Sequence, residues 1–71
     1  MPYINVTMAS GRTLEAKQAM MAAIAEAVSS SIGCDRSAVR VWVTEVAPEQ
    51  MSVGGTPLDQ VLAERAAAAT G

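Results

Sequence analysis

Three residues of this sequence could together handle a small organic acid: Pro2, Arg12 and Arg40. The chain has no histidine, so the usual proton carrier at neutral pH is missing. Arginine guanidinium groups are planar and permanently charged, and they bind carboxylates through two parallel hydrogen bonds. Pro2 follows Met1 directly, so removal of Met1 would leave a free secondary amine. The set therefore predicts an amine base beside two carboxylate-binding cations.

The amine of Pro2 would need to be neutral in order to accept a proton. An α-amine has a pKa of about 7.7–8.0 in peptides, and a prolyl amine starts somewhat higher. Desolvation in an apolar pocket and nearby cations both disfavour the charged amine, so both lower that pKa. Arg12 and Arg40 could supply the cations, which would make Pro2 a general base. The alternative is that Pro2 only starts a strand, where a residue without an N–H is tolerated.

Each arginine also has a structural interpretation. Arg40 interrupts the apolar run of residues 39–43, where an unpaired cation is costly. It therefore either binds a carboxylate ligand or forms a salt bridge between subunits. Arg12 lies in an expected loop, where a solvated surface charge is the commoner role. Spacing alone does not choose between these interpretations.

The other polar residues are weaker candidates for chemistry. Glu15, Lys17 and Glu26 are expected on the solvated face of a helix, and Glu45 in an ion pair at an interface. Cys34 has no histidine to activate its thiol. One cysteine without histidine cannot hold a structural zinc ion, so we expect no metal. The sequence does not indicate an organic cofactor either.

The chain is short for its hydrophobicity, since 51% of its 71 residues are hydrophobic. A domain of this size buries only about 60% of its unfolded surface, and it commonly needs disulfides, a metal or oligomerisation for stability. A single cysteine excludes a disulfide within the chain. We therefore expect one domain, residues 1–71, in an obligate oligomer.

Composition also limits the partners and the location. A net charge of −2 and only two aromatic residues argue against nucleic-acid binding. No apolar run approaches the length of about 18 residues that a membrane span needs, so no membrane partner is expected. The start of the chain lacks the pattern of a signal peptide. We expect a cytoplasmic protein.

Hydrophobic periodicity predicts the order strand, long helix, strand. Residues 2–8 alternate as a strand, and a helix should follow over residues 13–32, capped by Thr13 and ended by Gly33. Residues 39–46 form a second strand, which we expect to be central and covered on both faces. The strands should be parallel. The apolar stripe of the helix is expected to comprise Met20, Met21, Ile24, Ala27, Val28 and Ile32.

The remaining residues predict a smaller appendage. Residues 47–57 are rich in turn residues, which favours a short hairpin arm. Residues 58–69 have good helix propensity. The expected fold class is therefore α/β: a single βαβ unit with a C-terminal hairpin arm and helix.

Four segments in this order resemble the tautomerase superfamily, and within it the short 4-oxalocrotonate tautomerase subgroup. They are Pro2 after the initiator methionine, GRT at 11–13, SAVRVWVTEV at 37–46 and MSVGG at 51–55. The resemblance covers residues 2 to about 62. It implies that two βαβ protomers pair into a four-stranded sheet and that three such dimers form a homohexamer, with a hetero-hexamer as the alternative.

The resemblance also implies a role for each candidate residue. Pro2 would be the general base that moves a proton in a small 2-hydroxy-2,4-dienoate or related enol acid. Arg12 would bind the distant carboxylate. Arg40, from a neighbouring subunit, would hold the 2-hydroxy or 2-oxo end and stabilise the enolate. The implied enzyme is a cofactor-independent isomerase of the 2-hydroxymuconate tautomerase class.

Two positions depart from the pattern of this family. Met51 stands where members typically carry an aromatic residue, so it would form a softer substrate-binding wall; some hetero-oligomeric relatives share this methionine. Related dehalogenases carry a carboxylate near the position of Val53 and use it to activate water. Valine cannot do this, so dehalogenation is disfavoured. The alternatives are a subunit of a hetero-oligomer, a dehalogenase or lyase relative, and a non-catalytic oligomeric binding protein.

Overall fold

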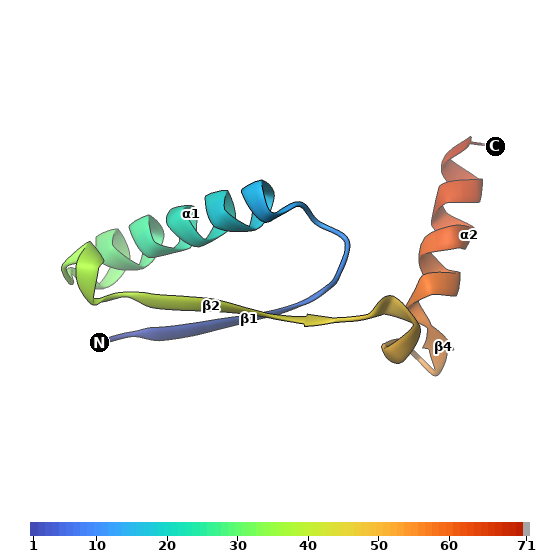
Figure 1. Cartoon of the computed structure of the whole chain (residues 1–71), viewed down its shortest axis with the longest axis horizontal. Helices are drawn as coiled ribbons and strands as arrows, with labels where there is room; N and C mark the ends of the chain where they lie inside the picture. The colour runs from blue at the N-terminus through green and yellow to red at the C-terminus, as the bar shows by residue number, and fades with distance from the viewer. Residues whose placement is uncertain (71) are drawn as a thin grey trace.

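Two parallel strands joined by a long helix form the body of the protein (Figure 1). The computed structural model describes residues 1–70, with side chains to Ala67. Strand β1 (Tyr3–Ala9) is followed by helix α1 (Leu14–Ile32), the 3-10 turn η1 (Arg36–Ala38) and strand β2 (Arg40–Val46). This confirms the predicted βαβ unit.

A small appendage follows β2, as predicted. It comprises the 3-10 turn η2 (Pro48–Gln50), the short antiparallel strands β3 (Ser52–Val53) and β4 (Thr56–Pro57), and helix α2 (Leu58–Thr70). Figure 1 shows α2 standing away from the βαβ unit, and the chain measures 46 × 24 × 20 Å. The first N–H of α2, on Leu58, donates to the carbonyl of Met51 at 2.8 Å. The appendage is therefore tied together internally rather than packed on the sheet.

Capping fixes both ends of α1 where the sequence predicts. The hydroxyl of Thr13 accepts a hydrogen bond from the Ala16 N–H at 3.1 Å, which satisfies one of the donors left free in the first turn. At the other end Gly33 adopts a left-handed φ of 71°, and its N–H donates to the Ser29 carbonyl at 3.0 Å. The helix length, and with it the position of β2, follows from these two residues.

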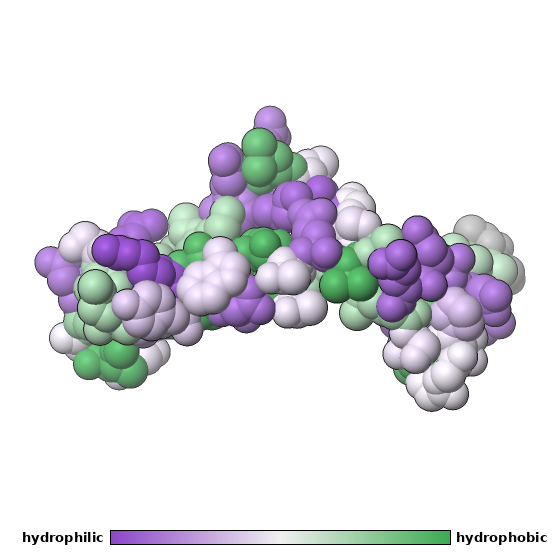
Figure 2. Space-filling model, turned by 60° about the horizontal axis from the view of Figure 1, so that its bottom comes forward, coloured by the Kyte–Doolittle hydropathy of each residue, from purple (hydrophilic) through white to green (hydrophobic). Residues whose placement is uncertain are grey.

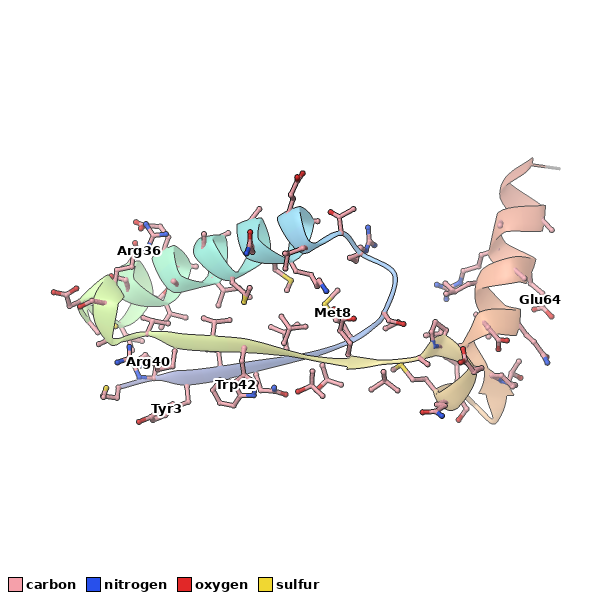
Figure 3. The ribbon with its side chains drawn as sticks, in the orientation of Figure 1. Tyr3, Met8, Arg36, Arg40, Trp42 and Glu64 are labelled. Atoms are coloured by element: carbon pink, nitrogen blue, oxygen red, sulfur yellow. The ribbon has the colours of Figure 1, made fainter. Side chains whose placement is uncertain are left out.

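The register of the strands separates two faces of the sheet. Tyr3 pairs with Arg40 and Ala9 pairs with Val46, so side chains alternate together along both strands. Figure 3 shows Tyr3 and Trp42 on the side away from α1, where they are 65% and 47% exposed. The prediction that the second strand is covered on both faces is therefore not met within one chain, because a single helix covers only one face.

The inner face of α1 differs in part from the predicted stripe. Met20, Met21, Ile24 and Val28 are half-buried as expected. Ala27 and Ile32 were assigned wrongly. Ala27 is exposed at the margin of the stripe, and Ile32, the last helical residue, is 65% exposed beyond the packed part of the helix. Lys17 and Ala25 join the half-buried set instead.

The chain buries little of its hydrophobic surface on its own. Among the residues with described side chains, none is fully buried, and the inner layers of the helix and the sheet are only half-buried. Figure 2 shows hydrophobic side chains reaching the surface between polar ones. The core of the described protomer is therefore small, and domains of this length are only marginally stable on their own. No helix among the described residues is long and apolar enough to cross a membrane.

The cap of α1 gives a first test. We expect Thr13→Ala to lower the free energy of unfolding by about 1 kcal/mol, because it leaves an N–H of the first turn without its acceptor. Ser30→Ala is the control: Ser30 is exposed in the last turn of α1, and alanine has the better helix propensity. Urea denaturation at one fixed protein concentration measures the free energy of unfolding of both variants. Equal stability of the Thr13→Ala variant and the wild type would contradict the assigned cap.

Candidate functional site

Pro2 and Arg40 lie together at the start of the two strands. The Arg40 N–H donates to the Pro2 carbonyl at 3.0 Å, which extends the parallel ladder by one step beyond Tyr3. Pro2 is half-buried, and the Met1 in front of it is 72% exposed. The structure thus brings two of the three predicted catalytic residues to one end of the sheet within the same chain.

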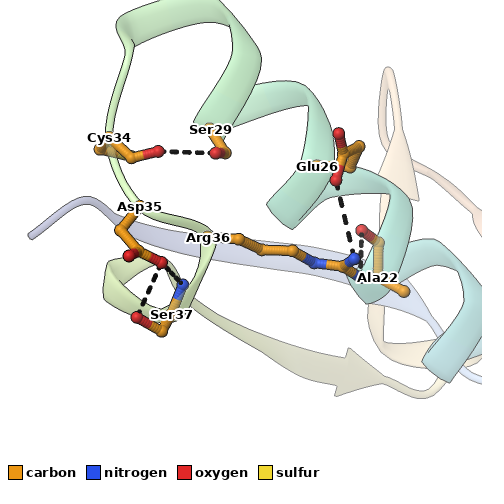
Figure 4. Close-up of polar contacts among 7 residues, drawn as sticks. All are labelled: Ala22, Glu26, Ser29, Cys34, Asp35, Arg36 and Ser37. Atoms are coloured by element: carbon orange, nitrogen blue, oxygen red, sulfur yellow. Dashed lines mark hydrogen bonds and ion pairs between the residues drawn. The ribbon is translucent and has the colours of Figure 1, made fainter.

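A short turn holds the side chain of Arg40. Its Nη1 donates to the carbonyl of Ser37 at 2.7 Å. Ser37 in turn donates its N–H, at 3.0 Å, and its hydroxyl, at 2.9 Å, to the carboxylate of Asp35 (Figure 4). The backbone hydrogen bond first, and then the hydroxyl, lower the pKa of Asp35 below its usual value of 3.8. Asp35 therefore fixes the turn whose carbonyl orients Arg40.

A second set of contacts ties the same turn to α1. Arg36 lies 3.6 Å from the Glu26 carboxylate and donates to the Ala22 carbonyl at 3.5 Å (Figure 4). The hydroxyl of Ser29 donates to the Cys34 carbonyl at 2.6 Å. The exposed positions of Glu15 and Glu26 agree with the predicted solvated helix face, and Cys34 is a free, half-buried thiol.

Arg12 lies at the opposite end of β1 from Pro2. Seven strand residues separate the two ends, a span of about 23 Å at the usual rise of a strand. Arg12 is exposed and makes no hydrogen bond or ion pair with any other described residue. One chain therefore cannot bring Arg12 to the amine of its own Pro2.

A pocket of about 330 Å³ opens beside Arg12. It is lined by Met8, Arg12, Ala16, Lys17 and Met20, and thus by three apolar side chains and two cations. Figure 3 places Met8 below the first turns of α1, at the far end of the sheet from Tyr3 and Arg40. A volume in this range suits a small organic molecule. The two cations suit one that carries negative charge.

Lys17 faces the sheet rather than solvent, so its predicted place on the solvated face is wrong. Its ammonium forms an ion pair with the Glu45 carboxylate at the end of β2, and the side chains are 20% and 33% exposed. The ion pair of Glu45 is thus within the chain, and not at an interface as predicted. The sequence does contain a signal for the inward position of Lys17. Lys17 precedes Met20, Met21 and Ile24 by three, four and seven residues, which is the spacing of one helix face.

Met51, the predicted substrate-binding residue, lies in the appendage beyond β2. It is half-buried, and its carbonyl accepts the hydrogen bond from Leu58. Met51 does not line the pocket beside Arg12. The predicted site residues therefore occupy three places in one chain: Pro2 with Arg40, Arg12 alone, and Met51 alone. No group of three potential metal ligands occurs among the described residues.

The comparisons with known proteins agree on one family. The family model described as "Tautomerase enzyme" matches residues 2–60. A probable tautomerase of Ralstonia nicotianae is 40% identical over 57 residues, which cover 80% of this chain and 81% of the relative. The 2-hydroxymuconate tautomerase of Pseudomonas sp. strain CF600 is 31% identical over 61 residues, 86% of this chain and 97% of the relative.

The fold has a close counterpart among solved structures. A heterohexamer 4-oxalocrotonate tautomerase from Chloroflexus aurantiacus superposes with a TM-score of 0.82 at 28% sequence identity. The match covers 86% of this chain and 98% of that one. The α/β fold with a βαβ unit and a C-terminal helix is therefore that of solved 4-oxalocrotonate tautomerases.

The Asp35 turn predicts a pH-dependent stability. Because the pKa of Asp35 is lowered in the folded state, its contribution is present above the unfolded value of 3.8 and is lost as the pH falls through the folded pKa. We expect Asp35→Ala to have a lower Tm than wild type at pH 7, with a difference that shrinks below pH 3.8. Thermal unfolding followed by circular dichroism measures this, with Glu64→Ala as an exposed-carboxylate control. A Tm difference that stayed constant down to pH 2.5 would contradict the assignment.

Proposed function

Since this chain is a member of the tautomerase family, we propose that it is a cofactor-independent enol–keto tautomerase of small 2-hydroxy-2,4-dienoates or related enol acids. Pro2, freed by removal of Met1, is the general base. Arg12 and Arg40 bind the substrate carboxylates, and Arg40 also stabilises the enolate. We place the enzyme in the cytoplasm, where its single cysteine stays reduced.

One observation carries this proposal: the distribution of charge over the βαβ unit. Four cations lie in this unit, in a protein whose net charge is −2. Lys17 and Arg36 have carboxylate partners. Arg12 and Arg40 have none among the described residues, although carboxylates outnumber cations in the chain. Cations left without carboxylates in an acidic protein are suited to an anionic ligand.

The proposed reaction moves one proton and changes no net charge. The neutral amine of Pro2 takes the proton from the 2-hydroxyl group of the substrate. The O–H electrons form the carbonyl, and the double bonds shift along the carbon chain of the substrate. The same amine then returns the proton to a carbon, which forms a C–H bond and regenerates the base. Negative charge develops on the 2-oxygen during the transfer. The guanidinium of Arg40, contributed by a neighbouring subunit, can stabilise that charge.

The distance between Pro2 and Arg12 requires a second copy of the chain. Among the described residues β1 pairs only with β2, so its other edge is open. Two copies that pair antiparallel along these edges about a two-fold axis place Arg12 of the partner subunit next to Pro2. The helix favours this arrangement, because α1 contacts β2 more than β1 and so leaves room above the open edge.

This pairing yields a four-stranded sheet, which we propose is the building block of a hexamer of three dimers. The sheet face that carries Tyr3 and Trp42 is open in the protomer and would lie between dimers. A hetero-hexamer with a second type of chain is the alternative, since one structural neighbour has that composition. Met51 would contribute a soft apolar wall and so tolerate more than one substrate shape.

The catalytic assignment is tested by three substitutions. We expect Pro2→Ala to lower kcat at least about a hundredfold through loss of the base, and Arg40→Ala by about a hundredfold through loss of charge stabilisation. Arg12→Ala should instead raise KM, by about tenfold, for the dicarboxylate 2-hydroxymuconate. Ketonisation followed by ultraviolet absorbance measures all three, after intact mass has shown that Met1 is absent. Wild-type activity in Pro2→Ala, or a retained Met1 in active enzyme, would refute the mechanism.

The shared site is tested by mixing two impaired variants, assayed with 2-hydroxymuconate well below its KM, where Arg12→Ala also has only about a tenth of wild-type activity. Pro2→Ala and Arg12→Ala chains, denatured together and refolded at equal amounts, form mixed dimers in half of the cases. Each mixed dimer has one site with both residues intact, so about a quarter of wild-type activity should return. Refolding each variant alone is the control. If the mixture were no more active than the separate variants, Pro2 and Arg12 would not act across a dimer.

A further inference from the structure

The pocket beside Arg12 contains a second cation to which the proposed mechanism gives no role. We infer that Lys17 is an anion-binding residue of this pocket, and that Lys17 and Arg12 together select substrates with a carboxylate at the end far from Pro2. The inference rests on the proposed function for the identity of the ligand. It adds Lys17 as a specificity-determining residue at the end of the substrate far from Pro2.

The position of Lys17 is fixed by its surroundings. It lies in the first turn of α1, where its N–H donates to the Thr13 carbonyl at 3.1 Å. Its side chain points to the inner face of the sheet, is only 20% exposed, and ends at the carboxylate of Glu45. Lys17 and Arg12 are therefore held on two sides of the same pocket, one by the helix and the other by the loop before it.

The ion pair with Glu45 leaves Lys17 able to bind a second anion. An ammonium group has three donors, and Glu45 takes one of them. Glu45 is not itself among the residues that line the pocket, so the charged groups of the lining are the two cations. Arg12, Lys17 and Glu45 together carry one net positive charge. A ligand carboxylate would balance this charge.

The rest of the lining suits the carbon chain of such a ligand. Met8 from β1 and Met20 from α1 supply flexible apolar contacts, and Ala16 leaves space between them. A carboxylate bound between Arg12 and Lys17 can make paired hydrogen bonds to the guanidinium and a single one to the ammonium. A substrate without this second carboxylate would leave Arg12 without a partner and would make no use of the remaining donors of Lys17.

The experiment compares a dicarboxylate with a monocarboxylate substrate. We expect Lys17→Gln to raise KM for 2-hydroxymuconate about tenfold, which is the loss of one charge-assisted hydrogen bond, and to leave KM for phenylenolpyruvate unchanged. Lys17→Arg, which retains the cation, should restore most of the loss. An equal rise in KM for both substrates, or no rise for 2-hydroxymuconate, would overturn the inference.

Glu45→Gln is the matched control, because it breaks the same ion pair and keeps both cations. We expect no rise in KM for 2-hydroxymuconate in this variant, since the pocket becomes more positive. A rise in KM equal to that of Lys17→Gln would show that the ion pair of Lys17 and Glu45 only stabilises the fold, and the inference would be wrong. Arg65→Gln, which removes an exposed cation of α2 that does not line the pocket, controls for net charge.

A binding measurement separates this inference from the proposed function. Glutarate, a saturated dicarboxylate, is titrated calorimetrically into Pro2→Ala protein with and without Lys17→Gln. We expect Lys17→Gln to weaken its Kd about tenfold. An unchanged Kd would overturn the role of Lys17 even if Pro2 proves essential for turnover. Full activity of Pro2→Ala would instead refute the tautomerase mechanism, whatever the Kd of glutarate.

Discussion

The parallel pairing of β1 with β2 is the constraint on which the rest of this protein depends. Parallel strands need a crossover, and here the crossover is α1, which can cover only one face of the sheet. The other face and the outer edge of β1 are left open in the single chain. With no described side chain fully buried, the protomer has little of the apolar burial that stabilises larger domains. A further copy of the chain is the simplest source of the missing contacts.

The same constraint shapes the proposed chemistry. A strand of seven residues holds Pro2 and Arg12 apart at its two ends, and only the backbone N–H of Arg40 pairs with the Pro2 carbonyl within one chain. If two such strands pair antiparallel, Pro2 of one subunit lies close to Arg12 of the partner subunit. Assembly would then supply both the buried surface and the complete site. Stability and activity should therefore depend on the same contacts.

Local signals in the sequence predicted most of the fold. Thr13 and Gly33 act through their own backbone geometry, and alternation in the strands reflects the pleat, so both can be read without tertiary information. Lys17 and Glu45 could not be paired from the sequence, because 28 residues separate them and only the packing of α1 on β2 brings them together. Ile32 matched the stripe by spacing alone, but its burial depends on how far the sheet extends under the helix.

The place of Lys17 on the inner face of α1 calls for more than a stabilising ion pair. A mostly buried pair of this kind contributes little net stability, because the loss of hydration of both charges offsets their attraction. A leucine or methionine at position 17 would extend the stripe of Met20, Met21 and Ile24, and burying such a side chain contributes about 1.5–3 kcal/mol. Stability alone would thus favour apolar residues at positions 17 and 45 together, since an apolar residue at position 17 alone would leave the Glu45 carboxylate without its partner. A lysine at this position is consistent with the anion-binding role that we infer for Lys17 beside Arg12.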